Sequence, residues 1–180
     1  SDAGAWMTGE VTYEGEAPSG IAHPRIGPLL SLDGRNLQKG KDRDAEALAL
    51  VSGNLDSASL LIAFEQNARI ARYDFSSAVG VSPPRGFIEL PQAARHMGRN
   101  GGFEAMTVMK GGPHAGEVIA FSERLMDSES NHEGWLWAAK GVRALKLKDK
   151  GGYDISDLAS LEDGSLIVLE RRFRWLEGLY

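Results

Sequence analysis

The chain has 180 residues, and 42% of them are apolar, which is enough for one domain with a hydrophobic core. Its 20 Lys and Arg against 25 Asp and Glu give a net charge of −5, which argues against a nucleic-acid-binding surface. No apolar run reaches about 18 residues, so the sequence predicts no membrane span. The absence of cysteine excludes disulfides, thiolate metal sites and cysteine nucleophiles. The 22 glycines between short apolar runs predict an all-β chain with many turns.

Three segments of the chain repeat one pattern, in which an acidic residue enters a short strand and a turn leads to a second apolar strand ending in Glu. The segments are residues 44–65, 102–123 and 155–170. The repeated acids are Glu46, Glu104 and Asp157, with spacings of 58 and 53 residues. A third strand is predicted after the first two units, at residues 69–75 and 142–147, where apolar and polar residues alternate.

Repeats of this length, built from three or four short antiparallel strands, are typical of the blades of a β-propeller. We therefore predict a single propeller domain over residues 1–180, with two full blades and two partial ones. The expected approximate blades are 1–42 (partial), 43–100, 101–150 and 151–180 (partial). The alternative is a β-sandwich whose hairpins resemble one another by chance. Helix is expected only as a turn or two, at Pro91–Met97 and Asp127–Trp135.

The partial blades at both ends predict that the chain is a truncated segment of a larger propeller. A segment of this kind has open sheet edges, and open edges pair with other chains. We therefore expect the chain to self-associate or to exchange strands with a second copy.

The repeated acids Glu46, Glu104 and Asp157 are the candidate metal ligands and catalytic residues. The first strand of each propeller blade lines the central channel, so acids at equivalent positions are expected to converge there. Several carboxylates around one cavity form an oxygen-rich site that suits Ca²⁺ or Mg²⁺. Such an ion could neutralise a phosphate and activate a bound water. In the alternative interpretation, each acid accepts backbone N–H bonds and fixes a blade corner.

A second set of charged residues lies where the second strands end. Glu65, Glu123 and Glu170 are the expected strand ends, although Ser122 could replace Glu123 if the register slips by one residue. Nearby arginines could form salt bridges with these acids or bind a phosphate bidentately. Arg171 and Arg172 alternate along a strand, so at most one of them can face the channel. The candidate substrate-binding residues are Arg69, Arg171 and Arg172, and Arg124 is a further possible ion-pair partner.

Other common sites have little support in this sequence. The histidines show no ligand spacing, and all of them are predicted to lie in loops: His23, His96, His114 and His132. No Gly-x-Ser-x-Gly elbow occurs, so an ordinary serine esterase is not indicated. The glycines near residue 100 lack a following Lys-Ser/Thr and do not form a P-loop.

Several of these stretches together resemble the bacterial "esterase-like activity of phytase" family over essentially the whole chain. The last stretch is the most specific, because it joins two strands, a tight turn and Glu-Arg-Arg at fixed spacing. The matching stretches are residues 1–6, 43–49, 63–70, 100–106 and 156–173. The resemblance implies an exported propeller protein, periplasmic or secreted, whose signal peptide lies outside these residues. It also implies hydrolysis of phosphate esters.

The resulting functional hypothesis is a phytase-like, metal-assisted phosphoesterase that acts on a phosphorylated small molecule. The negative net charge opposes a polyphosphate substrate unless a divalent ion compensates for it. Two alternatives stay open: a non-catalytic propeller that binds a ligand or protein, and a lactonase-like or other non-phosphate hydrolase with a channel metal.

Overall fold

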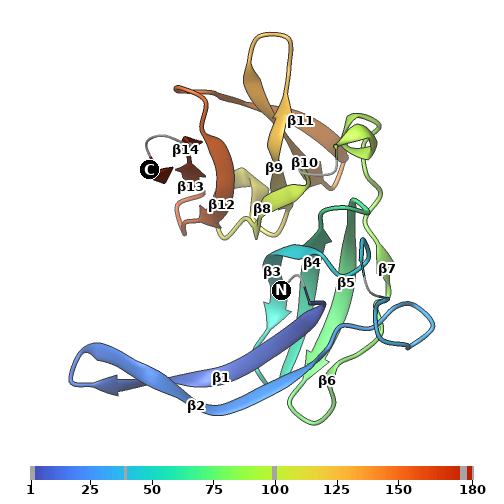
Figure 1. Ribbon diagram of the computed structural model, residues 1–180, viewed down its shortest axis with the longest axis vertical. Coiled ribbons are helices and arrows are strands. Elements are labelled where there is room, and N and C mark those ends of the chain that lie inside the picture. The colour runs from blue at the N-terminus through green and yellow to red at the C-terminus, as the bar shows by residue number, and fades with distance from the viewer. Residues whose placement is uncertain (1–2, 39, 99–100, 175–177, 180) are drawn as a thin grey trace.

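The computed structural model describes residues 3–38, 40–98, 101–174 and 178–179, and they form an all-β structure of antiparallel sheets (Figure 1). The expected all-β class is confirmed. The helical turn predicted at 91–97 is present as the 3₁₀ helix η1 (Ala93–His96), and a second one, η2, spans Gly112–His114. Residues 127–135 instead form a turn and the start of a strand. Among the described residues, no helix is long and apolar enough to cross a membrane.

The strands group into successive antiparallel sheets along the chain. A long hairpin comes first, with β1 (Ala5–Glu14) and β2 (Ala17–Pro28). The second sheet contains β3 (Ala45–Gly53), β4 (Ser57–Phe64), β5 (Arg69–Ser76) and β6 (Gly80–Val81), with β7 (Gly86–Phe87) also paired to β5. The third contains β8 (Phe103–Val108), β9 (Val118–Met126), β10 (Asn131–Ala138) and β11 (Gly141–Lys148). The last two are the pairs β12 (Asp154–Ser160) with β13 (Leu166–Arg171), and β14 (Phe173–Arg174) with β15 (Gly178–Leu179).

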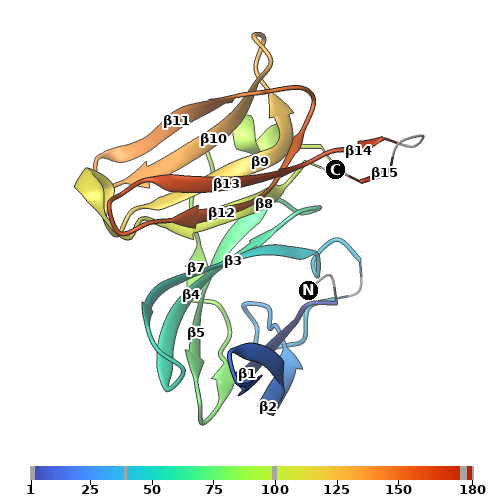
Figure 2. The same cartoon turned by 90° about the vertical axis from the view of Figure 1, so that its left-hand side faces the viewer.

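The first strands of three successive sheets lie beside one another, since β3 packs on β8 and β8 packs on β12 (Figures 1 and 2). The apolar core between the β3–β6 and β8–β11 sheets includes Leu61, Ile70, Phe103 and Trp135. A second buried cluster, around Ile119 and Leu158, joins the β8–β11 sheet to the β12–β13 pair. The sheets stack face to face without closing a ring in the part of the chain that the structure describes.

The hairpin β1–β2 docks at the far side of the β3–β6 sheet through Trp6. The Trp6 ring meets Phe75 edge-on, with 5.6 Å between the ring centroids. Gly27 and Gly80 allow the ring to approach the backbone, because a Cβ atom at either position would lie within 2.6 Å of it. Gly80 also has φ +88°, a conformation that favours glycine. This docking joins the hairpin to a core that contains Leu29, Tyr73 and Phe75.

Each of the three first strands carries a β-bulge near its start. The extra residue is Glu46 in β3, Glu104 in β8 and Ser156 in β12. A bulge places two residues opposite one and re-aims the side chains around it. The repeat predicted from the sequence is therefore real in its first two units, but the third is displaced by one residue. Ser156, and not Asp157, occupies the position of Glu46 and Glu104.

Candidate functional site

The candidate site lies where the bulged starts of β3 and β8 meet the ends of β4 and β9. The two sheets share the same backbone hydrogen bond at this place. Glu65 N–H donates to the Asp44 carbonyl, and Glu123 N–H donates to the Gly102 carbonyl. Ser122 is buried, and its hydroxyl donates to the Gly101 carbonyl at 2.7 Å. Glu123 is therefore the equivalent of Glu65, and the open question of the register is resolved in favour of Glu123.

Five carboxylates gather at this place, and we call them the carboxylate cluster: Asp44, Glu46, Glu65, Glu104 and Glu123. They form two overlapping triplets that share Glu65. In one triplet Glu65 joins Glu104 and Glu123, and in the other it joins Asp44 and Glu46. Within each triplet, one oxygen of each side chain lies within 4.8 Å of the others. Two of the three predicted acids, Glu46 and Glu104, thus belong to one cluster.

Two arginines hold one side of the cluster: Arg124, which follows Glu123 in β9, and Arg171 at the end of β13. Arg171 Nη2 lies 3.2 Å from Glu123 Oε1 and 3.7 Å from Glu104 Oε2. Arg124 Nη2 lies 3.0 Å from Glu123 Oε1 and donates to Asp154 Oδ2 at 2.8 Å. The Glu123 side chain is only 3% exposed, and the two arginines compensate its buried charge. In the β12–β13 register, Arg171 occupies the position that Glu65 and Glu123 occupy in the earlier sheets.

The pKa values of two residues of the carboxylate cluster, Glu65 and Glu104, are raised. Burial raises the pKa of Glu65, and the neighbouring charges of Asp44 and Glu123 raise it further. Burial is also the main cause that raises the pKa of Glu104, with Glu123 adding to the shift and Arg171 opposing it. Both carboxyl groups therefore hold a proton more readily than an ordinary glutamate, and a cation placed between them would have the opposite effect.

Gly102 provides the space in which Glu65 sits. A Cβ atom at residue 102 would lie 2.6 Å from Glu65 Cα and 2.7 Å from Glu65 Cγ, so one of the two sheets would have to move. Both carboxylate triplets share the Glu65 side chain, so a shift of Glu65 at this contact would change both of them.

We expect Gly102→Ala to displace Glu65 and to lower the free energy of unfolding by about 1–3 kcal/mol, the usual cost of overpacking. The adjacent Gly101→Ala is the matched control, because a Cβ atom there would lie 3.8 Å from the nearest other atom, an ordinary van der Waals distance. Chemical denaturation of both variants tests the prediction. Equal free energies of unfolding for the two variants would show that the close contact between residue 102 and Glu65 does not affect stability.

The other predicted site residues lie apart from the cluster. Asp157 is exposed in the middle of β12, and its carboxylate accepts a hydrogen bond from the Leu158 N–H at 2.7 Å. Arg69 donates to the carbonyls of Asp42 and Asn67 and covers the Phe64 ring at 3.8 Å.

Arg172 covers the Tyr153 ring and donates to the Gly151 carbonyl at 3.2 Å, whereas Arg171 points to the cluster. The alternation of these two arginines agrees with the expectation that only one of them serves the site.

The histidines differ from the prediction that all of them lie in loops. His23 is in β2, and His132 is in β10, where its side chain is 1% exposed. His114 is in η2 and pairs with Glu117 at 2.6 Å. The prediction for His132 failed because residues 127–135 were expected to form a loop with a helical turn, whereas Asn131–Ala138 form the strand β10.

Sequence analysis missed Asp44 and Asp154 as members of this site. Asp44 belongs to one carboxylate triplet, and Asp154 anchors Arg124. A signal for both was present, because each precedes its bulge residue by two positions.

The described residues thus form an all-β protein of stacked antiparallel sheets, with a carboxylate cluster held by arginines. The family described as Phytase-like, "Esterase-like activity of phytase", matches residues 1–180, and the chain belongs to this family. The resemblance noted in the sequence is thereby confirmed. Neither the curated proteins nor the solved structures contain a match to this chain.

Proposed function

We propose that the protein is a hydrolase whose stacked sheets are part of a β-propeller, with the carboxylate cluster near the propeller axis. The packing of β3 on β8 and of β8 on β12 supports this arrangement, because first strands of neighbouring blades adjoin one another around a propeller channel. Membership of the phytase-like family supports a hydrolytic activity. A periplasmic or secreted location belongs to the same proposal and depends on what the family resemblance implies.

The residues of the cluster fit a divalent cation. All of its donors are carboxylate oxygens, which Ca²⁺ and Mg²⁺ prefer. Oxygens within 4.8 Å of one another can share one Ca²⁺ ion, since two Ca–O bonds of about 2.3–2.6 Å span a similar distance. Glu65 would be a ligand in either triplet. The proposed cofactor is therefore Ca²⁺ or Mg²⁺, held by Glu65 together with Glu104 or Glu46.

The proposed reaction is hydrolysis of a phosphorylated small molecule. A bound divalent ion would supply charge neutralisation for the phosphate and a water of lowered pKa. Arg171, which is about half exposed, can orient a phosphate oxygen through its guanidinium group. If the triplet of Asp44, Glu46 and Glu65 holds the cation, Glu104 is left to take a proton from water or to return one to the leaving oxygen, a role that its raised pKa suits.

Hydrolysis of p-nitrophenyl phosphate and p-nitrophenyl acetate tests this function on the whole chain. We expect phosphate release that depends on added Ca²⁺ or Mg²⁺ and that falls by about 100-fold or more in Glu104→Gln. Asp157→Asn is the control, because Asp157 is exposed and lies apart from the cluster. Phosphate release that survives both a chelator and Glu104→Gln would exclude this mechanism. Turnover of the acetate alone would favour the non-phosphate hydrolase.

A second candidate function is a non-catalytic propeller that binds a ligand or a partner protein. The ion pairs favour it, because Arg124 and Arg171 already neutralise Glu123 and give part of the cluster a structural role. In this case Glu123→Gln would lower the stability of the fold, and no enzymatic activity would be found with either ester.

A further inference from the structure

The sheets of this chain stack according to one rule. Each sheet has a front and a back, defined by alternate residues of its first two strands. The back of the β3–β6 sheet carries Leu61 and Ala63 and packs on the front of the β8–β11 sheet, which carries Val118 and Ala120. The back of that sheet, with Phe121, packs in turn on β12–β13.

The same front-to-back contact is thus made twice within the chain. Leu166 and Val168 form the front of β13 in the second contact. One front and one back are left over at the two ends of the stack.

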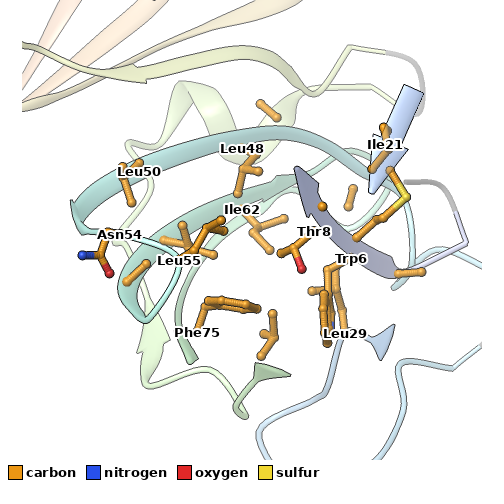
Figure 3. Close-up of a pocket in the computed structure, with 18 of the residues that line it drawn as sticks. Trp6, Thr8, Ile21, Leu29, Leu48, Leu50, Asn54, Leu55, Ile62 and Phe75 are labelled. Atoms are coloured by element: carbon orange, nitrogen blue, oxygen red, sulfur yellow. The ribbon is translucent and has the colours of Figure 1, made fainter. Parts of the chain in front are cut away.

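The front that is left over belongs to the β3–β6 sheet, where Trp6 and Leu29 cover only a part of it. Leu48 and Leu50 of β3 are 65% and 53% exposed, although they occupy positions equivalent to buried or half-buried residues of β8. They line an apolar groove of about 830 Å³ between β3–β4 and the hairpin β1–β2 (Figure 3). The hairpin contributes Met7, Val11 and Ile21 to the other wall of the groove.

The unused back belongs to β12–β13. Ile167 and Leu169 alternate with Leu166 and Val168 and are 56% and 60% exposed. By the register of the hairpins, Ile167 and Leu169 correspond to Leu61 and Ala63, which fill the back of the first sheet. The chain therefore carries both halves of one more front-to-back contact, and it exposes both.

The backbone pairing is incomplete at the same two places. Among the described residues, β1 pairs only with β2, and β13 pairs only with β12, so each pair is half of a sheet like β8–β11. The two pairs lie on the same open side of the stack, at opposite ends of it (Figure 2). Exposed edges and apolar faces of this kind are points of association between chains.

We propose that β12–β13 of one copy enters the groove of a second copy, with β13 beside the free edge of β1 and Ile167 and Leu169 packed on Leu48 and Leu50. The contact is head-to-tail, since it joins different surfaces of identical chains. Because each copy has one groove and one exposed β12–β13 pair, two copies satisfy each other and close a ring. Each shared sheet then has four strands, as the β8–β11 sheet does.

Two charged double variants test the contact from its two sides. Leu48→Asp with Leu50→Asp damages the groove, and Ile167→Asp with Leu169→Asp damages the opposite surface. All four positions are more than half exposed, so the changes leave the buried core of the monomer intact. Light scattering after size exclusion is expected to give twice the 19.5 kDa chain mass for the wild type and the single-chain mass for each variant. We expect each variant to weaken association by about 100-fold or more.

Mixing the two variants is the decisive step. The mixture keeps one intact groove and one intact β12–β13 surface, so it should form a 1:1 complex although neither variant associates alone. A contact between two grooves would not be restored by mixing. Val79→Asp with Val142→Asp is the control, because these exposed residues lie on the β5–β6 turn and on β11. Unfolding midpoints measured beside each profile confirm that the variants are folded.

Three results would overturn the proposal: a wild-type chain that stays monomeric at high micromolar concentration, variants that associate like the wild type, or a mixture that stays monomeric.

Discussion

Replacing Glu104 with glutamine should stabilise the folded protein near neutral pH, even though the residue belongs to the candidate site. The folded state raises the pKa of Glu104 through burial and the charge of Glu123. Between the ordinary glutamate pKa of about 4.3 and the raised value, the folded chain binds more protons than the unfolded chain. Stability therefore falls as the pH rises through this window. Glu104→Gln removes the charge, so the variant does not lose stability in this way as the pH rises.

Urea unfolding of the wild type and Glu104→Gln at pH 4 and pH 7, without divalent ions, measures this effect. The two proteins should differ more at pH 7 than at pH 4, with the variant more stable at pH 7. Glu14→Gln is a matched control, because Glu14 is exposed at the end of the β1 strand. A variant that loses stability equally at both pH values would show that the Arg171 contact outweighs the repulsion.

Replacing Glu123 is expected to destabilise the folded protein, and by more than Glu104→Gln stabilises it. Its carboxylate is buried and is held by Arg124 and Arg171, so Glu123→Gln leaves two arginines without their shared counter-charge. We expect the free energy of unfolding to fall by about 2–4 kcal/mol, toward the lower part of the range for broken buried pairs because the arginines are half exposed. The charge of Glu123 also raises the pKa of both Glu65 and Glu104, so those two values should fall.

Chemical denaturation and carboxyl ¹³C titration by NMR check the two parts of this prediction. The control is Asp33→Asn, since the Arg35–Asp33 pair is exposed on both sides and should matter far less. An unchanged unfolding transition in Glu123→Gln would mean that Glu104 and Asp154 alone hold the arginines.

The sequence was sufficient for the hairpins β3–β4 and β8–β9 of the first two repeats, because alternation and turn residues act locally. It did not predict the strand β10, whose first residues were expected to form a helical turn. It failed at the third repeat by one residue. Asp157 looks equivalent to Glu104 by residue type, but the β-bulge falls on Ser156 and moves Asp157 out of the equivalent position. A bulge depends on how two strands pair, which a single strand's pattern does not reveal.

The composition of the site was also only partly predictable. Glu46 and Glu104 were found from repetition, whereas the central position of Glu65 follows from the packing of Gly102 against it. The arginine that braces the cluster comes from the third repeat, where Arg171 replaces the glutamate of the first two. The role of Arg171 can be recognised only when the register of β12 and β13 and their position beside the earlier sheets are known.

The most direct test of the central claim, that the carboxylate cluster binds a divalent cation, is calorimetric titration of the whole chain with Ca²⁺ and Mg²⁺. Wild type should be measured beside Glu65→Gln, which removes the shared ligand of both triplets, and Asp157→Asn, which removes an exposed acid outside them. We predict binding by the wild type and by Asp157→Asn, and a loss of about tenfold or more in affinity for Glu65→Gln. No binding by the wild type, or equal binding by all three proteins, would contradict the claim.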